Sequence, residues 1–243
     1  MVSLKNRVAV VTGGSRGIGR AMAISLAEAG ADVAVNYLER KAEAESVAEA
    51  IAKMGCRAIA VGADVSRADQ VASLVSTAER ELGQIDVLIN NAGLAIIRGI
   101  DELTESDFDR TIAVNLKSCF LCTQAVVPGM RRRKWGRIVN ISSGAARGAG
   151  GIGPHYNASK AGMEGLTRGY AARLVKDGIT VNAVAPSLIE TDMVRAGLAS
   201  SPSRIPLGRF GTAQECAQVA MMLIGNAYMT GQTVALSGGM SFV

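Results

Sequence analysis

The sequence predicts a single α/β domain built on a doubly wound parallel sheet of about seven strands, with helices on both faces. Short runs rich in Val and Ile alternate with longer helical patterns along the whole chain. These short runs are apolar on both faces, which is typical of parallel strands covered on both sides. The 243 residues contain no long linker and no repeat, so residues 1–243 are interpreted as one domain.

The elements follow one another in regular alternation. Apolar runs predict strands at 7–12, 32–36, 57–61, 86–90, 137–142, 180–185 and 232–236. Helical patterns occupy about 17–29, 40–54, 67–82, most of 104–132, 155–176 and 212–223. Crossovers between parallel strands are right-handed, and ligands of such sheets bind beyond the carboxyl ends of the strands. Functional residues are therefore expected directly after the strands.

The composition is that of a globular protein. Hydrophobic residues make up 49% and charged residues 19%, while aromatic residues at 4% leave the core to Ala, Val, Ile, Leu and Met. The net charge of +5 suits an anionic ligand without implying nucleic acid. The basic run Arg131–Lys134 is interpreted as a solvated helix end, with a docking patch for an acidic partner as the alternative. Trp135 is the one aromatic residue beside it, which argues against a nucleic-acid surface.

The cysteines and the apolar segments indicate a cytoplasmic protein. Cys119 and Cys122 lie in an apolar helical pattern, and the single histidine cannot complete a zinc site with them, so they are expected to be buried and reduced. No signal peptide precedes the first strand, and no continuous apolar run reaches the ~18 residues of a membrane span. We therefore expect no metal and no membrane association.

A glycine-rich turn follows the first strand. In TGGSRGIG (12–19), Gly13, Gly17 and Gly19 have the spacing of a variant dinucleotide fingerprint. Glycines allow the backbone to approach a pyrophosphate, and the N-terminus of the following helix offers N–H groups to it. An ordinary tight turn is the alternative, but the position between a strand and a helix is the one the motif requires.

The end of the second strand distinguishes the two nicotinamide cofactors. An acidic residue there binds the ribose of NAD, whereas an arginine accommodates the 2′-phosphate of NADP. This strand ends in Asn36-Tyr37, while Arg16 lies in the glycine loop and Arg40 follows the strand. Glu39 could favour NAD, although it is placed beyond the strand end. We predict that NADP(H) is preferred over NAD(H).

Small and polar residues also follow the third and fourth strands. Asp64 and Val65 come from GADV (62–65), where the carboxylate could bind an adenine edge. Asn91, Ala92 and Gly93 come from NNAG (90–93), whose small residues would let the backbone line a cofactor. Together these turns fit the position at which such sheets bind ligands.

The fifth strand is followed by Ser142-Ser143, a glycine-rich stretch (144–153) and the sequence HYNASK (155–160). Tyr156 and Lys160 are four residues apart and share a helical face. An ammonium beside a phenol is expected to lower the phenol pKa, so that Tyr156 exchanges a proton with a carbonyl or alcohol oxygen. Ser143 can bind the same oxygen. His155 has no nucleophile to activate and is expected to border the pocket or cap the helix.

These motifs resemble the short-chain dehydrogenase/reductase family over essentially the whole chain. The resemblance rests on TGGSRGIG, NNAG, Asn115 in VNL, Ser143, and Tyr156-x-x-x-Lys160. It implies a Rossmann fold and a tetrad in which Tyr156 donates the proton and Ser143 positions the substrate carbonyl. Lys160 would bind the nicotinamide ribose and tune Tyr156, and Asn115 would hold a water that links Lys160 to solvent.

Within the family, the chain is most similar to the β-ketoacyl-acyl-carrier-protein reductases, through GITVNAVAP (178–186), IETDM (189–193), PLGRFG (206–211) and TGQTVALSGGM (230–240). This resemblance implies a homotetramer, a role in fatty-acid biosynthesis, and Lys134 at a docking position for the carrier. Two residues depart from the pattern: Ser187 replaces the usual glycine after Pro186, and Asp177 replaces a docking arginine. The carrier-bound substrate stays open on this ground.

We therefore expect a reductase of 3-oxoacyl thioesters bound to acyl-carrier protein or CoA. A reductase or dehydrogenase of a free ketone, alcohol or sugar, and a nucleotide sensor without turnover, are the alternatives. A substrate loop is predicted at about 187–206. The candidate cofactor-binding residues are Gly13, Ser15, Arg16, Gly17, Ile18, Gly19, Asn36, Tyr37, Asp64, Val65, Asn91, Ala92, Gly93, Tyr156, Lys160, Pro186, Ile189 and Thr191.

Overall fold

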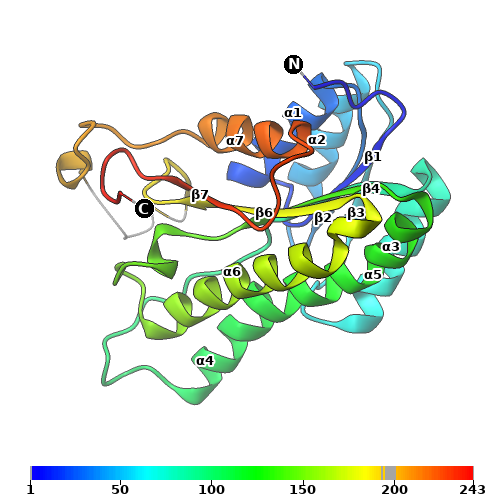
Figure 1. Ribbon diagram of the computed structural model, residues 1–243. Helices are drawn as coiled ribbons and strands as arrows, with labels where there is room; N and C mark the ends of the chain where they lie inside the picture. The colour runs from blue at the N-terminus through cyan, green and yellow to red at the C-terminus, as the bar shows by residue number, and fades with distance from the viewer. Residues whose placement is uncertain (1, 193, 195–200, 243) are drawn as a thin grey trace.

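The computed structural model in Figure 1 describes residues 2–192, 194 and 201–242, and it contains a seven-stranded parallel sheet. The strands lie in the order β3-β2-β1-β4-β5-β6-β7. Their bounds are β1 Val8–Val11, β2 Asp32–Tyr37, β3 Ala58–Gly62, β4 Ile85–Asn90, β5 Gly136–Ile141, β6 Ile179–Pro186 and β7 Thr233–Leu236. The order reverses between β1 and β4, which is the switch point expected of a doubly wound sheet. The predicted fold class is confirmed.

The helices cover both faces of the sheet. The longer ones are α1 Gly17–Glu28, α2 Lys41–Ala52, α3 Ala68–Leu82, α5 Ser118–Arg133, α6 Pro154–Leu174 and α7 Ala213–Gly225. Figure 1 shows α1, α2 and α7 above the sheet and α3, α5 and α6 below it. Alternate strand residues serve the two faces: Ala9 and Val11 pack against α1 and its neighbours, whereas Val8 and Val10 pack against α3 and α5.

The predicted helix at 104–132 is divided into three parts. α4 (Glu105–Thr111) begins with a capping box between Thr104 and Asp107. A π-helical turn, η1 (Ile112–Lys117), then joins α4 to α5. The one extra residue per turn is a local distortion that sequence periodicity does not reveal, and such π-turns are frequent at functional sites. This turn carries Asn115, which is buried.

The segment Glu105–Arg133 is also the one described helical stretch long and apolar enough to cross a membrane. We expected no continuous apolar run of that length, and the segment qualifies on hydropathy averaged over 18 residues. Of that window, 44% is buried inside the protein. α5 packs against β4, α3 and η1, so we interpret the segment as a core helix.

The basic run at the end of α5 is exposed at Arg131, Arg132 and Lys134, as expected of a solvated helix end, and it is also paired with groups of the chain itself. Asp177, in the short helix η3 (Val175–Asp177), accepts from Arg131 Nε at 2.7 Å and from Lys134 Nζ at 2.6 Å. Arg133 bonds to Gln84 and to the carbonyl oxygen of Ile85. Hydrogen bonds from Lys134 and then Arg131 lower the pKa of Asp177, so its carboxylate stays ionised beside the run.

The cysteines are free thiols; Cys119 and Cys122 are buried, as predicted, and Cys216 is buried as well. Burial raises the pKa of Cys119 and Cys122 to about 12, which keeps both thiols protonated at neutral pH. Among the described residues no group of His, Cys, Asp and Glu could hold a metal ion. The CxxC spacing therefore serves packing between α5 and the sheet.

Candidate active site

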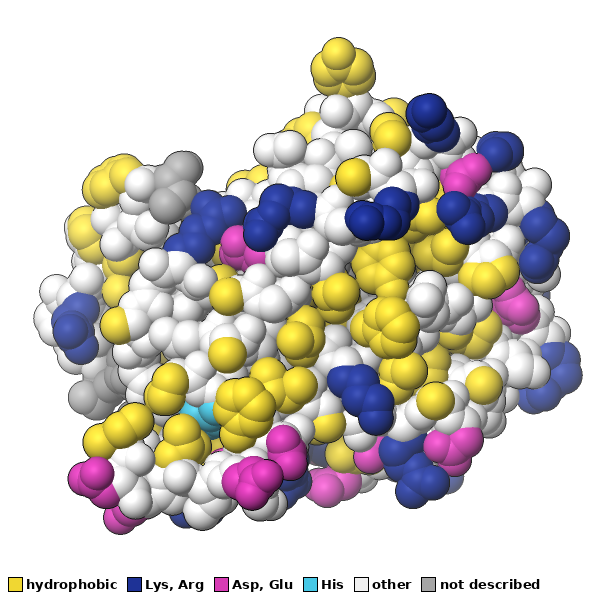
Figure 2. Space-filling view, turned by 60° about the horizontal axis from the view of Figure 1, so that its bottom comes forward, with side chains coloured by type: hydrophobic (Ala, Val, Ile, Leu, Met, Phe, Trp, Pro, Cys, Tyr) yellow, Lys and Arg dark blue, Asp and Glu magenta, His cyan; other side chains and the backbone are white. Residues whose placement is uncertain are grey.

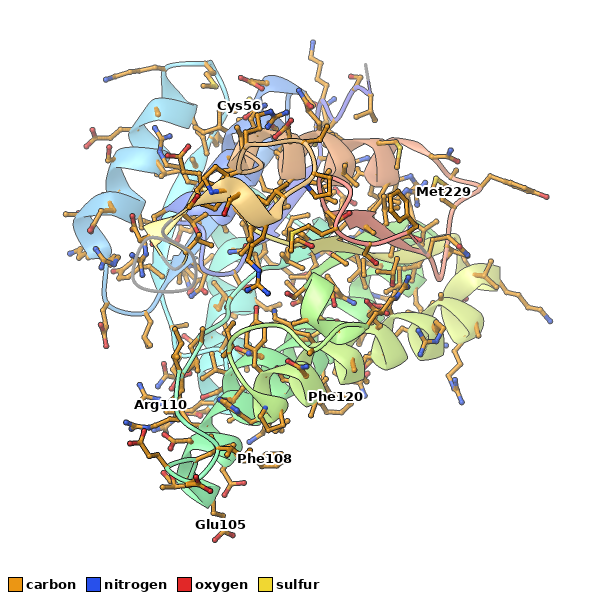
Figure 3. The ribbon with its side chains drawn as sticks, turned by 90° about the vertical axis from the view of Figure 1, so that its left-hand side faces the viewer. Cys56, Glu105, Phe108, Arg110, Phe120 and Met229 are labelled. Carbon is orange, nitrogen blue, oxygen red and sulfur yellow. The ribbon has the colours of Figure 1, made fainter. Side chains whose placement is uncertain are left out.

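A cleft of about 1500 Å³ opens at the carboxyl ends of the strands. The carboxyl ends of the strands point to the left in Figure 1, the side that Figure 3 turns toward the viewer. Every residue predicted to bind the cofactor lines this cleft, from the glycine loop to Thr191. Ser143 lines it as well, whereas Asn115 lies just beneath it. Residues far apart in the sequence thus meet at one edge because all seven strands run in the same direction.

The glycine loop has the shape that a pyrophosphate requires. Gly13 and Gly17 have positive φ angles of 61° and 54°, and a Cβ on Gly19 would collide with the carbonyl oxygen of Gly13. α1 then begins at Gly17 with no side-chain cap and no acidic residue in its first turn. Its N-terminal N–H groups and the positive end of its dipole suit a bound anion. The residues present therefore fit a dinucleotide.

Two buried side chains hold the loop in this shape. Asn36 Oδ1 accepts from the amide of Gly13 at 3.2 Å, and its amide group donates to the carbonyl oxygens of Val61 and Ala63. Thr12 Oγ1 accepts from the amides of Asn91 and Ala92 at 2.9 and 3.0 Å. Asn36 thus fixes the loop from beneath while it also lines the cleft. Thr12 begins the TGGSRGIG motif but was given no role there, since a threonine at a strand end has no distinguishing signal in the sequence.

The two arginines considered for a 2′-phosphate both carry carboxylate partners. Arg16 Nη1 lies 2.6 Å from Asp192 Oδ2, and Arg40 Nη1 lies 2.9 Å from Glu43 Oε1. Both pairs are exposed and line or border the cleft, so they exchange readily with solvent or ligand. Glu39 also lines the cleft, beyond the end of β2 as predicted. Asp64 is engaged as well, accepting from the amide and hydroxyl of Ser66.

Helix α6 brings Tyr156 and Lys160 to the floor of the cleft. Tyr156 is 7% exposed and Lys160 is 4% exposed. Lys160 Nζ donates to the carbonyl oxygen of Ile141 at 2.8 Å and lies 5.7 Å from the centre of the Tyr156 ring. The i, i+4 spacing places both side chains on the face that meets β5.

The acidity of this pair differs from the sequence-based expectation. Burial raises the pKa of Tyr156, and a hydrogen bond from Ser143 opposes that rise only in part. Burial also lowers the pKa of Lys160 to about 8. The ammonium lies over the ring and is directed at Ile141, so it does not depress the Tyr156 pKa as predicted. The phenol is therefore kept protonated, which suits a proton donor.

Ser143 and Asn115 complete the cluster. Ser143 caps the short helix η2 (Gly144–Ala146) by accepting from the amide of Ala145 at 3.2 Å. Asn115 Oδ1 accepts from Leu94 at 2.8 Å, and its Nδ2 donates to Leu94 O and to Ser159 Oγ, both at 3.1 Å. A Cβ on Gly93 would lie 3.3 Å from Asn115 Oδ1 and 3.6 Å from Lys160 Nζ. The side chains of Asn115 and Lys160 thus flank Gly93.

His155 neither borders the cleft nor caps α6, contrary to the sequence-based expectation. It is 1% exposed, and its Nε2 lies 3.0 Å from the carbonyl oxygen of Ile96. The N-cap position of α6 is Gly153, and no side chain bonds there. His155 therefore joins the start of α6 to the segment that follows β4.

Ser187, which departs from the family pattern, packs against the loop after β5. A Cβ on Gly144 would lie 2.5 Å from Ser187 Oγ, so the serine side chain fits only because residue 144 is a glycine. Residues 193 and 195–200 of the predicted substrate loop lie outside the described residues. The described part returns to the sheet through a bridge between Ile189 and Gly211.

Comparisons with known proteins agree with this geometry. The profile of the family described as short chain dehydrogenase matches residues 7–200. A 3-oxoacyl-acyl-carrier-protein reductase of Staphylococcus epidermidis is 41% identical over 243 residues, covering 97% of this chain and 99% of the relative. A protein of the same name from Synechocystis is 42% identical, covering 99% of each chain. One from Pseudomonas aeruginosa is 40% identical, covering 98% and 99%.

The family match spans the glycine loop, the strand-end turns and the Tyr156-Lys160 helix, and the relatives align over nearly the full chain. The cleft has the glycine cradle of a dinucleotide site and a buried tyrosine, its pKa raised by burial, beside a buried lysine. The chain therefore belongs to the short-chain dehydrogenase family and is an NAD(P)-dependent short-chain oxidoreductase.

Proposed function

We propose that the protein reduces 3-oxoacyl thioesters to 3-hydroxyacyl thioesters with NADPH, the acyl chain being carried on acyl-carrier protein or CoA. The observation that carries this proposal is the group of Ser143, Tyr156 and Lys160 on the floor of the cleft. The names of the relatives support the substrate class. A role in fatty-acid biosynthesis and a cytoplasmic location follow from the same substrate class.

The chemistry follows from the protonation states of the site. A bound NADPH would supply a hydride to the carbonyl carbon. The Tyr156 hydroxyl, whose pKa is raised, donates its proton to the carbonyl oxygen, and Ser143 donates a hydrogen bond to the same oxygen. Lys160, with a pKa of about 8, can return a proton to the phenolate at neutral pH. Asn115 flanks Lys160 across Gly93 and is proposed to hold a water that links it to solvent.

Removing the phenolic hydroxyl tests this assignment. Tyr156→Phe should lower kcat by about 10²–10⁴-fold, the range that general acid–base groups contribute. The dissociation constant of NADPH should change less than twofold, because the glycine loop is untouched. Steady-state oxidation of NADPH and fluorescence titration measure the two quantities. A variant that keeps wild-type turnover would refute the proton-donor role, and a wild-type protein inactive on every carbonyl in a broad panel would favour the nucleotide sensor.

The buried Lys160 should lower the free energy of unfolding, although it supports catalysis. Since burial lowers its pKa from 10.5 to about 8, the folded state binds fewer protons than the unfolded state between these pH values. The penalty is complete below pH 8 and fades as the pH rises to 10.5. Lys160→Met should therefore raise the free energy of unfolding by roughly 2 kcal/mol at pH 7, after the loss of the bond to Ile141 is counted.

Urea denaturation at several pH values measures this effect. The gain should shrink as the pH rises toward 10.5, while kcat is lost throughout. Arg173→Met, on the same helix at an exposed position, is the control and should show no such pH dependence. A destabilised Lys160→Met variant at pH 7 would contradict the expectation.

The preference for NADPH rests on Arg16. Its guanidinium lies at the glycine loop, and Asp192 is the carboxylate that a 2′-phosphate would have to displace. We expect NADPH to bind more tightly than NADH, and Arg16→Ala to weaken NADPH binding by about tenfold or more with little effect on NADH. Asp192→Asn should strengthen NADPH binding by about two- to fivefold, since an exposed ion pair is weak. Tighter binding of NADH by the wild type would refute the preference.

The charge of Asp177 bears on whether the substrate is bound to a carrier protein or is free. This carboxylate binds Arg131 and Lys134, and so it reduces the positive charge that an acidic carrier protein would meet. That observation favours the second candidate function, reduction of a free ketone, alcohol or sugar. If a carrier docks here, Asp177→Arg should raise kcat/KM for an acetoacetyl-carrier protein by about tenfold and leave acetoacetyl-CoA unchanged. Equal effects on both substrates would exclude docking at the run.

We also propose a homotetramer. Figure 2 shows hydrophobic side chains gathered on the lower face of the molecule. Phe108 and Phe120, labelled in Figure 3, are exposed on α4 and α5, and Tyr228 is 100% exposed between α7 and β7. Exposed patches of this kind typically mark interfaces. Sedimentation velocity is expected to give a species of four chains, and a monomer at micromolar concentration would contradict this.

A further inference from the structure

A buried acid lies one turn beyond the catalytic lysine and has no part in the proposed chemistry. The Glu164 side chain is 6% exposed. Its Oε2 accepts from Arg147 Nε at 3.0 Å, and its Oε1 lies 3.4 Å from Ser142 Oγ. The Ser142 hydroxyl also lies 3.2 Å from the carbonyl oxygen of Lys160. Glu164, which belongs to α6 itself, thus binds two residues of the segment after β5, and Ser142 binds α6 a second time through the Lys160 carbonyl.

This loop needs external support. Residues 144–153 include five glycines, which lose more conformational freedom on ordering than any other residue type. Gly150 and Gly153 have positive φ angles of 64° and 145°. Asn157 donates to the carbonyl oxygens of Gly148 and Ala149 at 3.0 and 2.6 Å. α6 therefore holds the loop at two points, through Asn157 and through Glu164.

Removing the Glu164 carboxylate from water costs free energy, and packing at this position does not require a charged side chain. Burying a carboxylate is unfavourable, and an apolar side chain of similar volume would serve the α6 interface at least as well. Arg147 lines the cleft, whereas Glu164 is not among the described residues that line it. The pair therefore reaches from the wall of the cleft into the interior beside Ser142, the neighbour of Ser143 in the chain. We infer that the ion pair contributes by holding neighbouring groups in place and not by contacting a ligand.

We propose that Glu164 and Arg147 are positioning residues, whose ion pair holds the loop after β5 against α6 and thereby fixes Ser143 relative to Tyr156. The proposal rests on the roles assigned above to Ser143 and Tyr156. Small displacements of groups that hold a reacting atom cost large factors in rate. The effect should appear in turnover and substrate binding and spare cofactor binding, because the hydrogen bonds and ion pair that Glu164 and Arg147 form with described residues do not involve the glycine loop or the Asn91 turn.

The first test is Glu164→Gln, which keeps the shape and removes the charge. We expect kcat/KM for acetoacetyl-CoA to fall by about tenfold or more, with the NADPH dissociation constant within twofold of wild type. Hydrogen exchange of the amides of residues 144–153 should become faster, while that of α1 stays unchanged. Arg147→Met should give a similar loss, and Arg147→Lys should recover part of kcat. The double variant should lose no more than the larger single loss, because both changes break one contact.

Asp86→Asn is the matched control. Asp86 is also a buried acid, 7% exposed at the side chain, with Arg7 at 3.2 Å and Arg133 at 3.4 Å, but it lies at the amino end of β4. It should lower the melting temperature and leave kcat/KM unchanged. Wild-type kinetics in Glu164→Gln would show that the positioning role is wrong. So would a variant that, like Asp86→Asn, changes its melting temperature without a selective loss of kcat/KM.

The exchange measurement separates this inference from the proposed function. Loop protection depends on the ion pair and not on the substrate, so it can be read even if acetoacetyl-CoA is a poor substrate. Unchanged exchange of residues 144–153 in Glu164→Gln would overturn the inference, whatever the substrate proves to be. An active Tyr156→Phe variant together with faster loop exchange would instead overturn the assigned chemistry.

Discussion

The buried ammonium of Lys160 is the constraint around which the site is built. Its Nζ is removed from water and bonded to the carbonyl oxygen of Ile141, and its pKa falls to about 8 because the charged form is poorly solvated. A side chain held in this way requires a helix that cannot shift along the sheet. Much of the polar structure between β4, β5, α5 and α6 supplies that rigidity.

A buried hydrogen-bond network lies directly beneath the lysine. Asn140 of β5 accepts from Asn90 of β4 at 2.8 Å and donates to Thr167 of α6 at 2.8 Å, while Cys119 of α5 lies 3.3 Å away. Asn90 and Asn140 are also register partners in the sheet. An apolar core tolerates small slips of one helix over another, whereas a saturated polar network accepts a single arrangement. The network therefore fixes two strands and two helices in the register that the lysine needs.

Much of this architecture could be predicted from the sequence. The predicted ends of the seven strands agree with the structure within one or two residues. The agreement is this close because the apolar pattern of the sequence determines where each strand begins and ends. The glycine loop and the Tyr156-Lys160 pair were found since their chemistry depends on residues close in the chain. The π-turn at Asn115, the bonds of His155 and the direction of the Tyr156 pKa were not, because each depends on which residues of distant segments meet.

Three cationic groups share one further property, of which Arg16 and Arg147 line the cleft and the basic run at Arg131 lies away from it, at the end of α5. Arg16, Arg147 and the basic run at Arg131 would each suit an anionic group of a ligand, and each is already paired with a carboxylate of the chain itself. For the exposed pairs, binding a phosphate or an acidic partner would be an exchange of one anion for another, with little net gain in charge neutralisation. For Arg147 the carboxylate is buried, so the exchange would leave an uncompensated charge in the interior. The same kind of contact is therefore replaceable where the carboxylate is exposed and fixed where it is buried, as it is beside Ser142.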